Sequence, residues 1–187
     1  MTYQTEIKSI HQVYGELQNS TNLTNQEEFQ PTKKTTMILE DTEVKISPGK
    51  IVKAWAFNGT VPGPTLRFTE GDKITILFIN NGTYPHTMHI HGIHDDKNDE
   101  VLPLIMPGKS YTYNITAEPA GALMYHCHVP PLAEHIRMGM YGALIIDPKD
   151  KPLTLAKEYY MVMSEFSTDE NNVTKFLADY YTINGYS

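Results

Sequence analysis

The sequence predicts an all-β domain of the Greek-key sandwich or barrel type. From Thr35 onward, apolar and polar residues alternate with a period of two, and Gly- or Pro-containing turn pairs interrupt this pattern at short intervals. Almost no helical periodicity is apparent within that region. Many short strands at this spacing are typical of antiparallel sandwiches and barrels, in which each strand buries one face.

The individual strands follow from the alternation and from the turns that bound it. We expect strands over residues 35–46, 50–57, 65–69, 73–80, 85–91, 109–116, 122–128 and 141–146. The turn signals between them are Pro48-Gly49, Pro62-Gly63-Pro64, Glu70-Gly71-Asp72, Asn81-Gly82 and Pro107-Gly108. One more strand is expected over 159–164, and the chain closes on TINGYS, which resembles AFNGTV at 56–61.

The same patterns divide the 187 residues into one domain with two appended segments. Residues 1–34 are expected to be an extension that is irregular or contains a short helix. Residues 35–150 form the domain, and 151–187 hold a C-terminal strand and tail that we expect to pack on it. The helix is suggested by apolar residues at helical spacing, namely Ile7, Ile10, Tyr14 and Leu17.

Composition excludes several classes of protein. A net charge of -7 with only two arginines argues against nucleic acid as a partner. One cysteine excludes a disulfide framework, and no run of about 18 apolar residues is present to span a membrane. The opening MTYQTEIKSI has neither the basic nor the apolar region of a secretory signal.

The motif that carries chemistry is His126-Cys127-His128, in MYHCHVPP. The only cysteine lies between two histidines, and His135 and Met140 follow within thirteen positions. A thiolate, two imidazoles and a weak axial thioether form the trigonal site typical of electron-transfer copper proteins. The missing imidazole is expected from a second cluster upstream, His86, His89, His91 and His94 in PHTMHIHGIH.

Each of these residues also has an ordinary structural interpretation. A lone cysteine is usually a small buried hydrophobe, and His11, far from both clusters, is best read as a surface residue or a core histidine with its hydrogen bonds satisfied. His94 is as well explained by the surface as by a metal, and Met140 could be core filler. The clustering of seven of the eight histidines favours copper over these readings.

Strand geometry sorts the candidate ligands into two sets. Side chains alternate across a strand, so His89 and His91 share one face and His86 points to the other. His126 and His128 likewise share a face, and Cys127 takes the opposite one. The first expected site is therefore His86, Cys127, His135 and Met140. The second set, on the other side of the two strands, is His89, His91, His126 and His128, and a bulge would break this assignment.

From about Val61 to Pro148 the chain resembles a cupredoxin domain of the multicopper oxidase and copper nitrite reductase superfamily. The resemblance lies in VPGPTLRFTEGDKITILFIN, HTMHIHG, IMPGKSYTYNI and HCHVPPLAEHIRMGMYGALIIDP. It implies a cupredoxin fold and a type 1 copper bound by His86, Cys127 and His135, with Met140 axial. It also implies that the second set corresponds to the His-x-His pairs that bind type 2 and type 3 coppers in the oxidases.

The chain departs from both branches of that superfamily. The oxidases assemble their trinuclear cluster from four His-x-His pairs, and this sequence has two. The resemblance to nitrite reductases implies His91 and His126 at a type 2 copper, with one histidine from a neighbouring subunit. However, His89 stands where those enzymes have a catalytic aspartate, and their second cupredoxin domain has no counterpart in this sequence.

We therefore expect a type 1 copper cupredoxin that performs one-electron transfer or simple small-molecule redox chemistry. Its partner would be a redox protein or a small-molecule electron donor or acceptor. We expect an exported protein, periplasmic, pseudoperiplasmic or extracellular, because redox copper chemistry is commonly kept outside the cytosol. The alternative is an oligomeric oxidase or nitrite reductase-like oxidoreductase, such as a homotrimer, with additional copper at subunit interfaces. Copper storage or delivery is a third class, which a rigid site suits less well. The axial position could also be filled by water or remain empty, and the second set could be an incomplete metal site.

Overall fold

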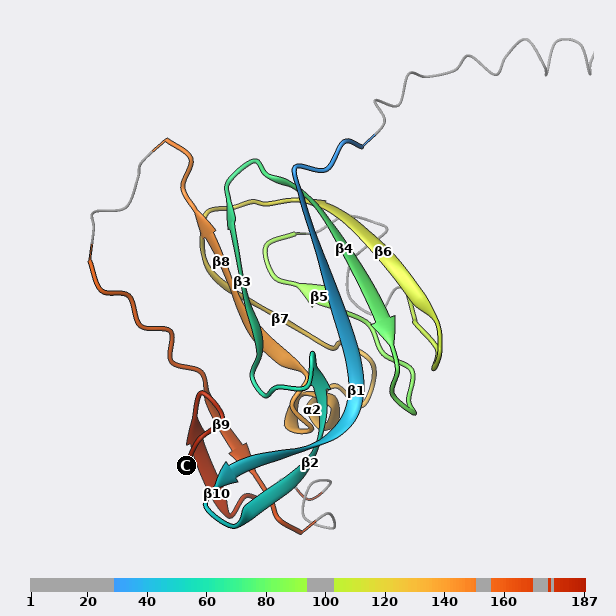
Figure 1. Ribbon diagram of the computed structural model, residues 1–187, viewed down its shortest axis with the longest axis vertical. Coiled ribbons are helices and arrows are strands. Elements are labelled where there is room, and N and C mark those ends of the chain that lie inside the picture. The colour runs from blue at the N-terminus through green and yellow to red at the C-terminus, as the bar shows by residue number, and fades with distance from the viewer. Residues whose placement is uncertain (1–28, 94–102, 151–155, 170–174, 176) are drawn as a thin grey trace, which may run out of the picture. The chain divides into compact units, whose positions relative to one another are not determined.

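The computed structural model describes residues 29–93, 103–150, 156–169, 175 and 177–187. Residues Pro31–Ser187 form one compact unit (Figure 1). The expected helix between Ile7 and Leu17, His11 and His94 lie outside the described residues. No helix among the described residues is long and apolar enough to cross a membrane.

The described elements are almost all strands, which confirms the predicted all-β class. They are β1 (Lys33–Ser47), β2 (Lys50–Phe57), β3 (Gly63–Thr69), β4 (Lys73–Asn80), β5 (His89–Ile90), β6 (Ser110–Thr116), β7 (Gly121–His126), α2 (Leu132–Arg137), β8 (Tyr141–Asp147), β9 (Met163–Phe166) and β10 (Tyr180–Ile183).

Two four-stranded sheets form the two layers of the domain. The first has the order β2-β1-β4-β6 and the second β3-β8-β7-β5, while β9 and β10 form a separate hairpin. The sequence predicted antiparallel strands, but two of the strand pairs are parallel: β1 with β4, and β3 with β8. Connections that cross from one layer to the other allow such parallel neighbours, since the chain need not turn back within one sheet.

The core lies between the two sheets and follows from the period of two. In β4, Ile74, Ile76 and Phe78 are almost fully buried and alternate with partly exposed residues. They pack in one cluster with Cys127 and Met140 from the opposite layer. Complete burial of a side chain such as Phe78 contributes roughly 2–3 kcal/mol. Two of the candidate metal ligands, Cys127 and Met140, are thus part of the hydrophobic core.

Three strand predictions were wrong in extent. Within 85–91 only β5 is a strand, and His86 makes an isolated bridge to Ile105. The strand expected over 122–128 ends at His126, where the chain turns towards α2. The segment expected over 159–164 pairs with β10 only from Met163 to Phe166. The short helix α2 was not predicted.

The C-terminal hairpin repeats a local structure that occurs at the end of β2. Asn58-Gly59 and Asn184-Gly185 both have positive φ, at 51° and 71° and at 52° and 84°, the conformation of a type I′ turn. Asn58 Oδ1 accepts a hydrogen bond from the Ile38 amide, and Asn184 Oδ1 accepts one from the Val162 amide. The similarity of AFNGTV and TINGYS therefore reflects one turn used twice.

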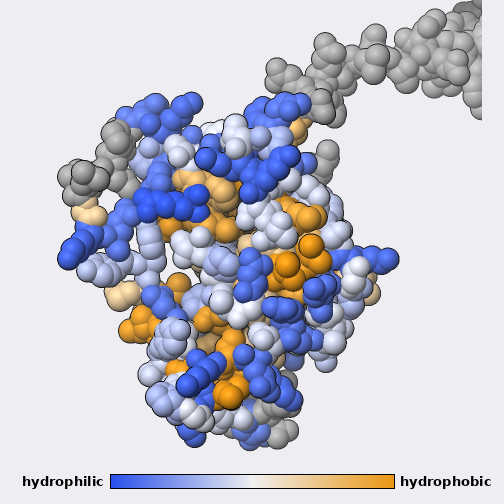
Figure 2. Space-filling view, in the orientation of Figure 1, coloured by the Kyte–Doolittle hydropathy of each residue, from blue (hydrophilic) through white to orange (hydrophobic). Residues whose placement is uncertain are grey.

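The hairpin contacts the domain through a second apolar cluster. Phe166 packs with Ile46, Val52 and Tyr141, and the Tyr141 hydroxyl donates to Ser164 Oγ at 2.5 Å. Its other face is exposed: Met163 and Ile183, which are direct cross-strand partners, are 81% and 51% exposed. Figure 2 shows hydrophobic residues interspersed with polar ones on this side of the molecule.

Close packing of Tyr125 on β8 predicts that Gly142 tolerates no side chain. The Tyr125 hydroxyl donates to Pro64 O at 2.6 Å, and a Cβ on Gly142 would lie 2.2 Å from that hydroxyl. We expect Gly142→Ala to lower the free energy of unfolding by about 3 kcal/mol, measured by urea denaturation of the metal-free protein. Ala122→Ser, at an exposed position of β7, should change it by less than about 0.5 kcal/mol. If both variants changed the free energy of unfolding by the same small amount, the Tyr125 ring would have moved aside to make room for the new methyl group.

Candidate metal centre

Two parts of the chain bring together the first set of ligands: His86 lies 41 residues before Cys127, whereas His135 follows Cys127 by only 8. His86 precedes β5, Cys127 directly follows β7, and His135 lies in the last turn of α2. The backbone amide of Cys127 donates to Met140 O at 3.1 Å, so the cysteine stays paired with the start of β8. All three side chains are buried, at 0%, 0% and 4% exposure.

Local sequence explains why His135 is on a helical turn. Leu132, Ala133 and Glu134 favour helix, and α2 ends where Gly139 adopts a φ of 108°. A Cβ on Gly139 would lie 2.6 Å from Val61 Cγ2. Glycine is therefore needed at position 139 both for this backbone conformation and because Val61 leaves no room for a side chain. The turn at Gly139 lets the chain enter β8 shortly after His135.

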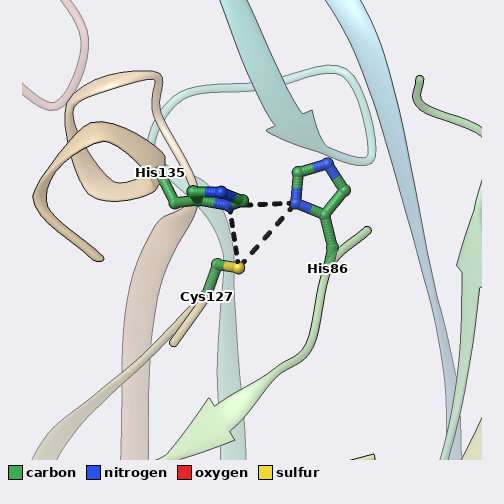
Figure 3. A group of neighbouring side chains, drawn as sticks. All are labelled: His86, Cys127 and His135. Atoms are coloured by element: carbon green, nitrogen blue, oxygen red, sulfur yellow. Dashed lines mark hydrogen bonds between the residues drawn. The ribbon is translucent and has the colours of Figure 1, made fainter. Parts of the chain in front are cut away.

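The three ligand atoms face one another. His135 Nδ1 lies 3.2 Å from Cys127 Sγ, His86 Nδ1 lies 3.8 Å from the same sulfur, and the two nitrogens are 3.2 Å apart (Figure 3). Metal–nitrogen and metal–sulfur bonds of about 2.0 and 2.3 Å would separate ligands in a trigonal plane by about 3.5–3.8 Å. The observed triangle is close to this size, so the residues fit a soft transition-metal ion.

Burial sets the protonation of this cluster. It lowers the pKa of His86 to about 3, with a contribution from neighbouring His135, and it lowers the pKa of His135. Burial also raises the pKa of the Cys127 thiol, against the backbone groups of Thr87, Val129 and His128. At neutral pH both imidazoles are therefore neutral and can donate a lone pair. A bound cation would reverse the effect on the thiol and displace its proton.

Met140 is fully buried in the cluster of core residues that includes Cys127. Its backbone carbonyl accepts from Cys127, and its own amide donates to His135 O at 3.2 Å. The backbone of Met140 is thus bonded to two of the three members of the triangle. Met138, the other methionine of the segment, caps α2 and is only partly buried.

The second set also comes together, through the pairing of β5 with β7. His89 is the direct partner of His126, and ring nitrogens of His89, His91 and His126 all lie within 4.8 Å of one another. His91 Nε2 and His126 Nε2 are 3.0 Å apart. His128 lies beyond the end of β7, and its ring centroid is 5.1 Å from that of His89. It stays beside the group but is not part of that triangle.

One hydrogen bond links the two sets. His126 Nδ1 donates to the Cys127 carbonyl at 2.7 Å, which leaves the lone pair on Nε2, the atom that faces His91. Burial lowers the pKa of His126, and the neighbouring His91 and His128 add to this. His126 is therefore a neutral, oriented ligand, joined to Cys127 by one carbonyl.

Sequence reasoning missed two aromatic residues beside the first set. The Trp55 ring centroid lies 4.8 Å from that of His135 and 5.3 Å from that of His86, and the Tyr84 ring contacts Trp55 at 4.9 Å with a tilt of 42°. The Trp55 amide donates to Met138 O at 2.8 Å. Only the pairing of β2 with the ligand loop reveals this contact, although Trp55 is the single tryptophan of the chain.

Comparison with known proteins places the chain in a family. Residues 39–151 match the multicopper oxidase family. A copper-containing nitrite reductase of Neisseria meningitidis is 34% identical over 127 residues, which are 67% of this chain and 33% of that protein. Copper resistance protein A of Escherichia coli is 33% identical over 159 residues, 79% of this chain and 26% of that protein.

Solved structures of the same family are also similar to this chain. A multicopper oxidase structure superposes with a TM-score of 0.75 and 39% identity, over 82% of this chain and 54% of that chain. The copper nitrite reductase of Nitrosomonas europaea gives a TM-score of 0.73 and 33% identity, over 83% and 57%. The domain is thus a cupredoxin, and the chain belongs to the multicopper oxidase family. It spans about a third of the length of the nitrite reductases it matches.

Proposed function

We propose that His86, Cys127 and His135 bind a type 1 copper and that the protein transfers single electrons through it. The observation that carries this proposal is the buried triangle of two Nδ1 atoms and one sulfur at 3.2 to 3.8 Å. The family supports the choice of copper, because its relatives include copper-containing nitrite reductases and a copper resistance protein.

The residues of the site suit this role. Copper held by a thiolate and two imidazoles supplies a couple between Cu(II) and Cu(I). His86 and His135 are neutral at working pH, and Cys127 gives up its proton when the cation binds. The three ligands come from separate, well-packed segments, which restricts their movement when the charge of the site changes. Met140 is the axial group in this proposal.

A second candidate function uses the second set of histidines. The convergence of His89, His91 and His126 within 4.8 Å supports a further copper on the opposite side of β5 and β7. With histidines from a second protein surface, such a site would make the protein an oxidase or a nitrite reductase-like enzyme. A closed homo-oligomer such as a trimer is the simplest source of that surface.

We also propose that the protein works outside the cytosol and exchanges electrons with a redox protein or a small molecule. The copper chemistry proposed for the site is the reason for both assignments.

The thiolate gives the first test of the type 1 assignment. Copper-loaded protein should be intensely coloured by charge transfer from Cys127, and Cys127→Ser should abolish the colour while the fold is retained. Visible absorption and EPR spectra, with copper content by atomic absorption, measure this. Met124→Leu, a half-exposed position of β7, should keep the full colour. A colourless copper-loaded wild type would rule out the assignment.

The axial group gives the second test. Met140→Leu preserves side-chain volume but removes the weak axial thioether. The copper would then have one donor fewer in a more apolar site, which disfavours the higher charge of Cu(II). The reduction potential should rise and the visible spectrum should shift. Met37→Leu, equally buried in the same core cluster, is the matched control. If both variants leave potential and spectrum unchanged, Met140 is not a ligand.

Copper stoichiometry tests the second set. The double variant His89→Ala/His91→Ala should lose about one copper per chain and keep the type 1 colour, because Cys127 points to the other side of the strands. Thr112→Ala/Asn114→Ala, on β6, controls for paired truncation. A wild type that holds a single copper per chain, unchanged in the double variant, would instead show that the second set is incomplete.

A further inference from the structure

The β9–β10 hairpin repeats the register of β1 and β2 as well as their turn. In β1 and β2 the four cross-strand pairs nearest the turn are Leu39–Phe57, Glu40–Ala56, Asp41–Trp55 and Thr42–Ala54. In the hairpin the four pairs at the same distance from the turn are Met163–Ile183, Ser164–Thr182, Glu165–Tyr181 and Phe166–Tyr180. Each of these hairpin positions therefore has one counterpart in β1 or β2.

The two pairs of strands pack against each other through corresponding faces. The second apolar cluster contains Ala54 and Ala56 of β2 together with Phe166, and Tyr180, the counterpart of Ala54, packs against it. Figure 1 shows the hairpin beside β2. The opposite face of β1 and β2 is the inner face of the first sheet, so the opposite face of the hairpin corresponds to an inner face.

Burial differs sharply between the counterparts on these opposite faces. In β1 and β2 the residues are Met37, Leu39, Trp55 and Phe57, and all four are buried in the core between the sheets. Their counterparts are Met161, Met163, Tyr181 and Ile183, which are between 51% and 81% exposed. The hairpin thus presents to solvent a face that has the form of the inner face of a sandwich.

The outer face of the hairpin, which consists of Met161, Met163, Tyr181, Ile183 and Tyr186, is large enough to bind another protein. Tyr186 belongs to it because its antiparallel bridge to Ile183 places the two side chains on one side. With about 200 Å² for a fully exposed large side chain, the face offers roughly 700 Å². The largest apolar patch of a typical monomer is about 300–600 Å², and a stable interface buries about 800 Å² per partner.

Charge on the outer face is already compensated within the chain. By alternation along β9, Glu165 is on the same side as Met163, and its carboxylate forms an ion pair with Arg137 of α2. The face therefore needs no charge of opposite sign from a partner, and an identical apolar face satisfies it.

We propose that the outer face of the hairpin is covered by the same face of a second copy of this chain, in a two-fold symmetric dimer. A two-fold axis uses one surface on both partners. The two faces pack about 10 Å apart, as the two sheets of a sandwich do. The unbranched side chains of Met161 and Met163 adapt to the opposing surface. The dimer does not depend on copper.

Sedimentation equilibrium of the metal-free protein at micromolar concentrations tests this dimer. The wild type should have twice the mass of one chain. Met163→Glu should raise the Kd of the dimer at least about tenfold, because two like charges then meet in an apolar interface. Met106→Glu changes a methionine that is also exposed but lies outside the outer face, and it should leave the Kd unchanged.

A charge exchange shows whether the face binds its own copy. Met163→Lys alone should weaken the dimer as Met163→Glu does. An equimolar mixture of the two variants should recover the dimer, because a lysine on one copy then faces a glutamate on the other. Circular dichroism of each variant verifies that it is folded.

Methionine oxidation gives a second measurement on the unmodified chain. Dilute hydrogen peroxide followed by peptide mass spectrometry reports the oxidation rate of each methionine. Met163 should oxidise severalfold more slowly at a protein concentration well above the Kd than well below it. Met106 should oxidise at the same rate at both concentrations.

Three outcomes would overturn the proposal. The first is a wild type that stays monomeric up to about 1 mM, since the second copy would then not be what covers the face. The second is a dimer that Met163→Glu leaves intact, since it would use another surface. The third is a mixture of the two folded variants that fails to associate. Loss in each variant, recovery on mixing and protection of Met163 support the dimer.

Discussion

The pairing of β5 with β7 is the constraint on which both candidate sites depend. It sets His89 directly against His126, and the alternation along β7 then directs the next residue, Cys127, to the other side. The Cys127 amide is held by Met140 O and its carbonyl accepts from His126. A shift of one residue in this register would exchange the two faces and separate both groups of ligands.

Burial of the ligand atoms costs free energy of folding when no cation is bound to them. The ligand atoms His86 Nδ1, His135 Nδ1 and Cys127 Sγ are buried and face one another at 3.2 to 3.8 Å, and burying polar groups that cannot all be satisfied costs free energy. His86 with its pKa near 3 is neutral across the physiological range. The fold thus holds lone pairs in place beforehand, and a metal ion compensates for part of the cost of burying them.

Much of this arrangement could be predicted from the sequence, because its determinants are local. The period of two predicted the strands of the sheets. The alternation of side chains within HTMHIHG and HCH predicted that Cys127 and His126 lie on opposite sides of their strand, and the structure places them in different groups. The rest depended on tertiary contacts. His86 reaches the site from an isolated bridge to Ile105 rather than from a regular strand, and β1 and β3 lie in parallel ladders that no local pattern specifies. Trp55 becomes significant only because β2 meets the ligand loop.

The repeated Asn-Gly turn shows how far local sequence alone determines structure. Asn58 follows β2 and is bonded to β1, whereas Asn184 follows β10 and is bonded to the residues just before β9. The side-chain amides nevertheless make the same bonds: Asn58 Nδ2 donates to Thr36 O, and Asn184 Nδ2 donates to Tyr160 O. The two turns have different surroundings but the same geometry. The conformation of an Asn-Gly turn is therefore determined by its own residues and by the strand beside it. The metal ligands are the opposite case, because each is positioned by a segment distant in the sequence, and their geometry therefore depends on the whole sandwich.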